Sequence, residues 1–187
     1  MALKTVAYRM SLKDVDAHYF ESAPDEIFCI ECGSVLDSSY VPPALVIHSG
    51  GPFALGSTYD GKALCSNATK ELMKREGLAV DFREVNSGLA LHHFEPREQL
   101  AFDVKKRRTR FIGRCSRCGG FAEVIGSQPV FLRNVSAPIL TGLFRTDVEF
   151  GSGRSKGPEL IVGLRTKEVL ENAKFGGCTY LPVAQDL

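Results

Sequence analysis

The stretches that decide the fold are residues 29–33, Cys-Ile-Glu-Cys-Gly, and residues 115–119, Cys-Ser-Arg-Cys-Gly. In each stretch two residues separate the cysteines, so both thiolates can reach one ion from a tight turn. The glycine after the second cysteine permits a backbone angle that other residues resist. We therefore expect four thiolates to hold one structural Zn²⁺ ion. They belong to Cys29, Cys32, Cys115 and Cys118.

The distance between the two motifs is unusual, because 82 residues lie between Cys32 and Cys115, whereas compact zinc ribbons have roughly 15–20. Closing a longer loop costs only about 0.6 kcal/mol per doubling of its length, and structural zinc contributes on the order of 10 kcal/mol. We therefore predict a split, zinc-ribbon-like site built from two knuckle hairpins, residues 26–36 and 111–121. Four thiolates leave no coordination position for water, so the site should not be catalytic.

Two other interpretations of the cysteine pairs stay open. A thiol–disulfide redox motif usually lies at a helix N-terminus, and the glycines at Gly33 and Gly119 oppose a helix there. Alternatively, one or both pairs are remnants that bind no metal. Cys65 and Cys178 lie outside the motifs and are expected to be small buried hydrophobic residues. The adjacent pair His92–His93 would face opposite sides of a strand, which argues against a ligand pair.

The rest of the pattern predicts an α+β fold with mixed or antiparallel sheets and few helices. One helix is expected over residues 66–76, capped by Ser66 or Asn67 and stopped by Gly77, and a second follows a cap at Thr166. The expected strands are residues 3–10 (an edge strand), 44–47, 79–85, 99–104, 159–164 and 178–183. We expect one domain over residues 1–187, with two pseudo-repeated halves, 1–98 and 99–187, as the alternative.

Composition and charge narrow the function. With 187 residues, 44% hydrophobic and 24% charged, the chain can bury its own core, and its net charge of +1 gives no global attraction to nucleic acid or membranes. No apolar run approaches the roughly 20 residues of a membrane helix. Charged residues interrupt residues 1–20, so no signal peptide is expected. We expect a cytoplasmic protein, in which six cysteines favour metal or redox chemistry over disulfides.

One basic stretch is an exception to this balance. Residues 105–110, with Arg114 and Arg117, place seven cations within thirteen residues. They suit phosphate contacts in nucleic acid, an acidic partner surface, or a solvated strand that offsets the negative charge of a four-thiolate zinc centre. The last two interpretations are favoured, because only Phe111 is near enough to stack on bases.

No catalytic motif is present: the sequence has no glycine-rich phosphate loop, serine elbow or histidine–glutamate metal helix. We therefore expect a protein that is not an enzyme. An enzyme that uses zinc only as a scaffold is the weakest alternative.

Two widely separated Cys-x-x-Cys-Gly motifs resemble the myxobacterial double-CXXCG motif family, which includes immunity proteins of swarming-inhibition toxin systems. The likeness continues in Leu143-Phe144-Arg145, in residues 160–163 and 169–173, and in a final Gly-x-x-x-Tyr-Leu-Pro ending at Pro182. Two departures are Ile30 and Ser116, which stand where a proline would follow the first cysteine.

The resemblance implies an immunity protein, or antitoxin, that binds and neutralises a cognate toxin delivered by neighbouring bacteria, with structural zinc and no catalytic residues. Aromatic residues in loop-like sequence are candidate anchors for the toxin. These are Tyr40, Phe53, Tyr59, His92 and Phe94. The alternative function is a zinc-ribbon nucleic-acid-binding or regulatory protein that uses residues 105–117.

Overall fold

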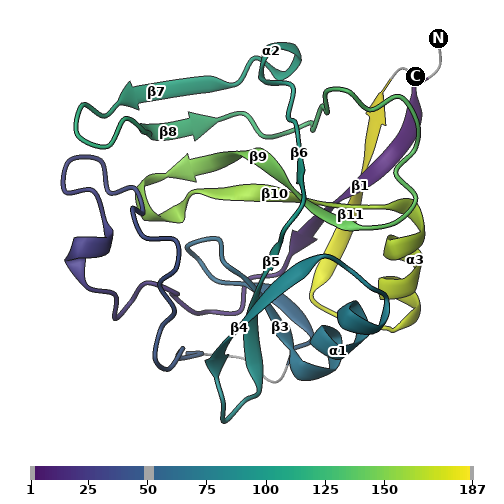
Figure 1. The fold of residues 1–187 in the computed structure, drawn as a ribbon, viewed down its shortest axis with the longest axis horizontal. Helices are drawn as coiled ribbons and strands as arrows, with labels where there is room; N and C mark the ends of the chain where they lie inside the picture. Colours follow the sequence, from purple (N-terminus) through teal and green to yellow (C-terminus); the bar gives the residue numbers. More distant parts are fainter. Residues whose placement is uncertain (1–2, 49–52, 186–187) are drawn as a thin grey trace.

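Two β-sheets and three α-helices form the structure, a computed structural model that describes residues 3–48 and 53–185 (Figure 1). The larger, seven-stranded sheet has the order β11-β1-β10-β9-β8-β7, and β6 pairs with β9. Its strands are β1 (Lys4–Leu12), β6 (Gln99–Leu100), β7 (Arg110–Arg114), β8 (Phe121–Ile125), β9 (Leu143–Ser152), β10 (Gly157–Val162) and β11 (Cys178–Gln185).

The smaller, four-stranded sheet has the order β2-β3-β5-β4. Its strands are β2 (Leu55–Ser57), β3 (Ala63–Ser66), β4 (Val80–Asn86) and β5 (Leu91–Pro96). All described strand pairs are antiparallel except β6 with β9. The α-helices are α1 (Asn67–Arg75), α2 (Val104–Arg107) and α3 (Leu164–Asn172), and η1 (Asp25–Ile27) and η2 (Gly153–Ser155) are short 3₁₀ helices. The predicted α+β class with mainly antiparallel sheets is confirmed.

Helix α1 forms where the sequence predicts it. The Ser66 hydroxyl accepts a hydrogen bond from the Thr69 amide at 3.3 Å and so caps the first turn. Leu72 and Met73 are buried, and Gly77 takes a positive φ of 67° just beyond the last turn. Helix α3 begins earlier than predicted, after Gly163 rather than after a cap at Thr166. The buried Thr166 hydroxyl instead accepts from the Gly142 amide at 2.9 Å, which satisfies a neighbouring turn.

Strand β1 corrects the prediction of an edge strand at residues 3–10. It lies inside the larger sheet, between β10 and β11, and Val6, Ala7 and Met10 are buried. Alternation along one segment shows which side chains face the core, but it does not show how many strands pair with it. Here both partners lie more than a hundred residues away in the sequence.

Two other predicted strands are wrong or shortened. Residues 44–47 form no strand; Leu45 is buried and bonds through its main chain to the Val85 carbonyl at 2.8 Å and to the Asn86 side chain at 2.9 Å. The strand predicted over residues 99–104 ends at Leu100, because α2 starts at Val104 with Asp103 as its cap. The basic run thus begins in a helix.

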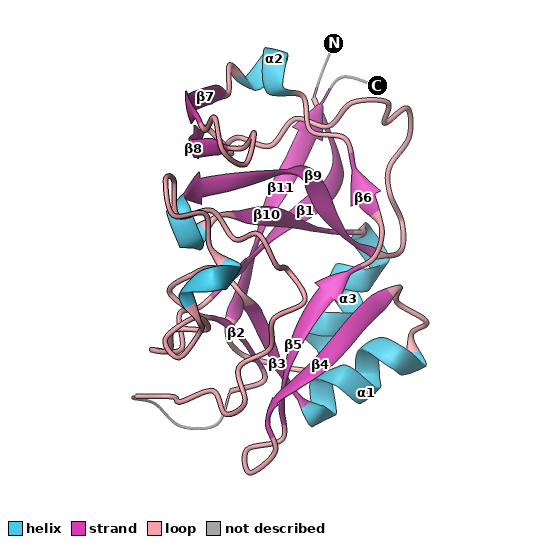
Figure 2. Cartoon of the chain, turned by 60° about the vertical axis from the view of Figure 1, so that its left-hand side comes forward, coloured by secondary structure: helices cyan, strands magenta, loops and turns pink. Residues whose placement is uncertain are grey.

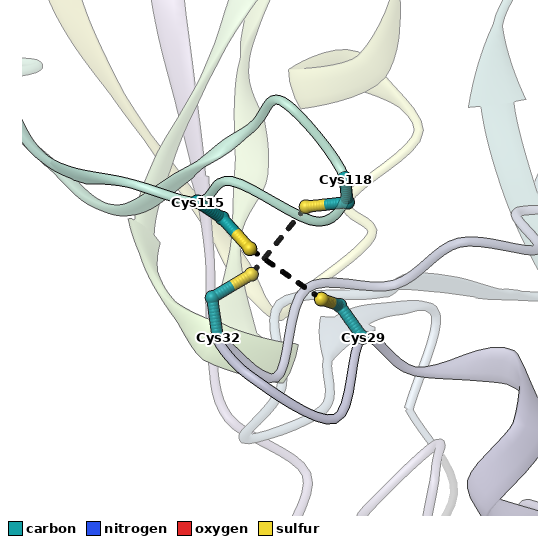
Figure 3. A group of neighbouring side chains, drawn as sticks. All are labelled: Cys29, Cys32, Cys115 and Cys118. Carbon is teal, nitrogen blue, oxygen red and sulfur yellow. Dashed lines mark hydrogen bonds between the residues drawn. The ribbon is translucent and has the colours of Figure 1, made fainter.

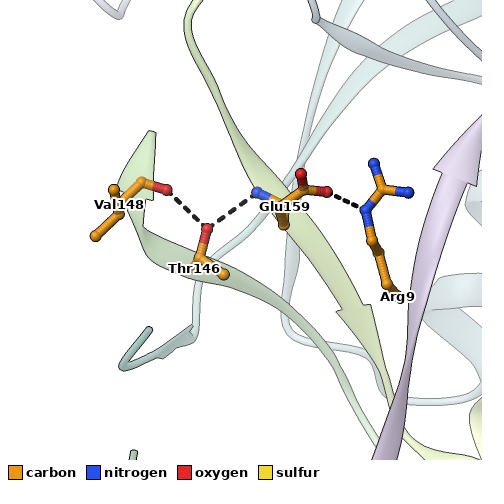
Figure 4. Close-up of polar contacts among 4 residues, drawn as sticks. All are labelled: Arg9, Thr146, Val148 and Glu159. Carbon is orange, nitrogen blue, oxygen red and sulfur yellow. Dashed lines mark hydrogen bonds and ion pairs between the residues drawn. The ribbon is translucent and has the colours of Figure 1, made fainter. Parts of the chain in front are cut away.

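A polar contact marks the middle of the larger sheet (Figure 4). Thr146 in β9 donates its hydroxyl to the Val148 carbonyl at 2.7 Å and accepts from the Glu159 amide at 2.9 Å. These bonds lie where the β9–β10 register shifts, so the threonine hydroxyl supplies a bond that the ladder loses there. The Glu159 side chain forms a mostly buried ion pair with Arg9 in β1.

One hydrophobic cluster joins the two sheets to the helices α1, which lies against the smaller sheet, and α3, which lies against β1 of the larger sheet (Figure 2). It includes Met10 and Val162 from the larger sheet, Phe94 from the smaller sheet, and Met73 and Leu170 from the helices. Both sheets therefore share a core. Neither nine-residue helix, nor α2, is long and apolar enough to cross a membrane, and the same holds for every described helix.

The turn between α3 and β11 brings the backbone beside the larger sheet into close contact with β2 of the smaller sheet. Gly177 has a φ of 99°, and its carbonyl accepts from the Lys13 amide at 2.7 Å. A Cβ at this position would collide with the Leu55 carbonyl group of β2. Gly176 next to it has nothing within 4 Å of such a Cβ.

This pair of glycines provides a matched test. Gly177→Ala should lower the free energy of unfolding by about 3 kcal/mol, from overpacking and backbone strain combined. Gly176→Ala should change it by less than about 1 kcal/mol. Urea unfolding of the metal-loaded protein measures both. Equal losses would contradict this role for the Gly177–Leu55 contact.

Candidate metal centre

The four predicted cysteines converge on one point between two hairpins (Figure 3). Their Sγ atoms all lie within 4.8 Å of one another. Cys29 and Cys115 are 3.7 Å apart at sulfur, and Cys32 and Cys118 are 3.5 Å apart. A tetrahedron with metal–sulfur distances of about 2.3 Å has edges of about 3.8 Å. The sulfur positions therefore fit one tetrahedral metal ion, and all four cysteines are free rather than disulfide-bonded.

The two knuckles have the same main-chain geometry. The Gly33 amide donates to the Cys29 carbonyl at 2.7 Å, and the Gly119 amide donates to the Cys115 carbonyl at 3.0 Å. Both glycines have positive φ, 69° and 75°. The amide of each first cysteine also bonds back across its turn, to the carbonyls of Ser34 and Gly120. Glycine therefore stands where the sequence predicts a turn that other residues would strain.

Burial divides the four sulfur ligands into two kinds. Cys29 and Cys115 are buried, whereas Cys32 and Cys118 are half-buried. The Ser34 hydroxyl lies 3.1 Å from the Cys32 sulfur. Hydrogen bonds from the side chain and backbone of Ser34 lower the pKa of Cys32 to about 6. Cys32 is thereby favoured as a thiolate, the form that binds metal.

A third segment, the connection between β9 and β10, supports both knuckles. The Lys156 ammonium donates to the Ser34 hydroxyl and to the Phe121 carbonyl, each at 2.6 Å. It thus links the first knuckle to the strand that leaves the second. Its positive charge also lies one side chain away from Cys32, where it offsets the negative charge of a four-thiolate centre.

Arg154 fixes the same connection to the segment before the first knuckle. Its guanidinium lies 3.8 Å above the centre of the Phe28 ring and 3.5 Å from the Asp25 carboxylate. The knuckles also touch directly, because the Ser116 hydroxyl donates to the Glu31 carboxylate at 3.3 Å. Three segments of the chain therefore position the sulfur atoms.

Sequence patterns did not point to Ser34, Arg154 or Lys156. Ser34 directly follows the first motif, so its position was a signal that could have been used. Arg154 and Lys156 lie more than thirty residues after the second motif. No local pattern shows that their hairpin returns to the metal centre.

The remaining cysteines and histidines lie outside this cluster. Cys65 is fully buried, and burial raises its pKa to about 12; the half-buried Cys178 also has a raised pKa, chiefly from burial. Burial lowers the pKa of His93 to about 4, so at neutral pH its ring is uncharged and its Nδ1 donates to the Ala63 carbonyl at 2.9 Å. Nothing in the described structure brings His92 or His93 to the four sulfurs.

Two of the five proposed toxin anchors are not on the surface. His92 and Phe94 are buried in β5, which pairs with strands on both sides, so the prediction that they contact a partner is wrong. Tyr40 and Phe53 are half-buried against the cluster around Tyr19. Tyr59 is 53% exposed and stays a candidate anchor.

Chemically, four soft sulfur ligands would fill the coordination sphere of a tetrahedral ion and leave no open position for a substrate. The Glu31 carboxylate lies at the edge of the cluster and accepts from the Cys115 sulfur at 3.3 Å. The donor set therefore fits a structural metal. Comparisons of the chain with models of known protein families, with curated proteins and with solved structures find no match.

Removing one ligand tests the shared centre. Cys32→Ser and Cys118→Ser should each lose the bound metal and at least about 4 kcal/mol of stability, which lowers the melting temperature by roughly 10 °C. Elemental analysis and thermal melting measure both effects. Cys178→Ser, outside the cluster, should keep the metal. Full metal content in Cys32→Ser and Cys118→Ser would rule out a single shared site.

Lys156 gives a second test, of the support around the ligands. Lys156→Met removes the ammonium but keeps the length of the side chain, so we expect zinc affinity to fall by roughly 10- to 100-fold. Competition with a chromophoric chelator measures the affinity. Lys13→Met, which removes an exposed cation elsewhere, should leave it unchanged. Equal affinities of the Lys156 and Lys13 variants would contradict the proposed support.

Proposed function

We propose that Cys29, Cys32, Cys115 and Cys118 bind one zinc ion and that this ion is structural. The sulfur spacing, close to the edge length of a zinc tetrahedron, is the observation that supports this proposal. Four-sulfur tetrahedral sites take zinc or iron. Elemental analysis identifies the metal directly. The visible absorption spectrum gives a second test, because zinc bound to four thiolates is colourless and iron bound to four thiolates is coloured.

The same geometry supports a zinc-ribbon-like unit assembled from distant parts of the chain. The first knuckle lies in a minimal hairpin closed by a bridge between Phe28 and Val35. The second lies in the turn between β7 and β8, whose last pair is Arg114 with Phe121. In this proposal the ion joins the second hairpin to the first, which itself packs into a hydrophobic cluster through Ile27 and Phe28.

We infer that the protein is a cytoplasmic immunity protein that binds and neutralises a cognate protein toxin and is not an enzyme. The double Cys-x-x-Cys-Gly resemblance supports this role, and so does a metal site with no open coordination position. An inhibitor gains from rigidity, because a surface that is already ordered loses less entropy on binding. A metal that locks three segments supplies such rigidity.

A second candidate function is nucleic-acid binding through the stretch 105–117, and one observation favours it. None of its seven cations makes an ion pair in the described structure. Phe111 lies 5.1 Å from Phe121, and the Lys106 ammonium lies 4.9 Å from the centre of the Phe131 ring. Unpaired cations beside aromatic rings are the components of a single-strand binding surface.

Native mass spectrometry of the protein co-expressed with the product of its neighbouring gene tests the immunity proposal. We expect a complex that carries one zinc ion per copy of this chain. Cell survival should depend on this chain whenever the neighbouring product is expressed. A neighbouring product that is harmless and never associates would overturn the immunity role.

A further inference from the structure

Strand β7 is at the free end of the larger sheet. It pairs with β8 on one side only, and it lies at the upper left of the molecule in Figure 1. All five of its residues are exposed. The outer side of such a strand presents main-chain N–H and C=O groups that another strand can pair with. Gly113 has a positive φ of 63°, so the regular spacing of these groups covers Arg110 to Ile112.

The surroundings of this edge are strongly cationic. Arg110 and Arg114 lie in β7 itself, and Lys105, Lys106 and Arg108 lie in or directly after α2. The whole chain has 23 basic and 22 acidic residues, so outside the stretch 105–117 it has 16 basic and 22 acidic residues. The edge is therefore a local positive field on an otherwise acidic protein.

Apolar side chains are exposed among these cations. Phe111 is 43% exposed, and Ile112 and Ile125 are each 40% exposed. Arg110 is paired in register with Ile125, and Arg114 with Phe121. An extended peptide that alternates acidic and apolar residues could complement this mixture of charge and hydrophobicity.

We propose that the outer edge of β7 is a docking strand for an acidic, extended segment of a partner protein, which adds to the larger sheet as its next strand. The proposal rests on the proposed function, since the partner would be the toxin. Main-chain hydrogen bonds would fix the register of the added strand, and Arg110 and Arg114 would select carboxylates.

The metal centre would hold one end of β7 in a fixed position. Arg114 directly precedes the ligand Cys115, and the Cys115 amide donates to the Gly120 carbonyl at 2.7 Å. One end of β7 is therefore held before a partner arrives, which lowers the ordering cost of strand addition.

Other occupants fit the edge less well. Two copies of the chain joined edge to edge would bring Arg110 and Arg114 of both copies together, and like charges in facing strands are destabilising. A nucleic acid would use the cations and Phe111, but it cannot pair with the main-chain groups of a strand. Only a peptide uses the charge, the apolar side chains and the open edge at once.

The probe is a fluorescent twelve-residue peptide of alternating glutamate and valine, measured by fluorescence anisotropy with the zinc-loaded protein. A matched peptide with alternate N-methylated amides keeps the charge but cannot complete the strand pairing. A twelve-nucleotide oligothymidylate tests nucleic acid. Hydrogen–deuterium exchange locates the contact, and sedimentation tests for a second copy.

We expect the unmodified peptide to bind, to protect β7 amides, and to bind at least tenfold more tightly than the methylated peptide. Arg110→Gln with Arg114→Gln should weaken binding roughly tenfold. Arg75→Gln, an exposed cation on α1, should not. Equal binding of both peptides, tighter binding of the oligonucleotide, or self-association through β7 would each overturn the proposal.

Binding measurements with the neighbouring gene product distinguish failure of the docking proposal from failure of the immunity role. If the neighbouring gene product binds the double variant Arg110→Gln/Arg114→Gln as tightly as the unaltered chain, this result supports the immunity role and contradicts the β7 docking site. If the glutamate–valine peptide binds β7 and the neighbouring product never associates, the docking edge stands and the immunity role falls.

Discussion

The convergence of four sulfur atoms within 4.8 Å is the constraint on which the rest of the structure depends. Two thiolates 3.7 Å apart repel each other by about 4 kcal/mol at an effective dielectric constant near 20. Four ionised cysteines in this volume would therefore repel one another strongly unless a cation lies among them. The Lys156 ammonium supplies one positive charge from outside the cluster, because it donates to the Ser34 hydroxyl beside Cys32. A divalent ion at the centre would supply the remaining positive charge. The first hairpin contributes Ile27 and Phe28 to a hydrophobic cluster, whereas the second has few buried residues, so the ion would attach the second hairpin to a part of the chain that is already packed.

The sequence was informative where the determinants are local. The knuckle turns need a glycine after the second cysteine, and the helix α1 needs a cap, an apolar face and a stop; each requirement is met within a dozen residues. The sequence was not informative where the determinants are distant. Strand β1 is internal because β10 and β11 flank it, and Thr166 is used by a neighbouring turn rather than as a cap. Lys156 supports the metal centre only because a hairpin folds back onto it.

The smaller sheet and strand β7 differ in how far their side chains are buried. The smaller sheet carries His92, His93 and Phe94 on a strand that is paired on both sides, so these residues serve the core. Strand β7, next to the metal centre, instead carries exposed residues of both kinds, namely Arg110 and Arg114 with Phe111 and Ile112. If β7 binds a partner as proposed, its position next to the metal centre would help this surface to keep its shape.

The internal position of β1 also has a consequence for how the protein is made. Residues 4–12 are translated well before the strands that flank them, residues 157–162 and 178–185. Until those strands have been made, β1 has no partner strand in the larger sheet, and that sheet cannot close. Partially made chains therefore expose an apolar strand that chaperones can bind, and truncation near β11 would remove a partner of the first strand rather than a peripheral tail.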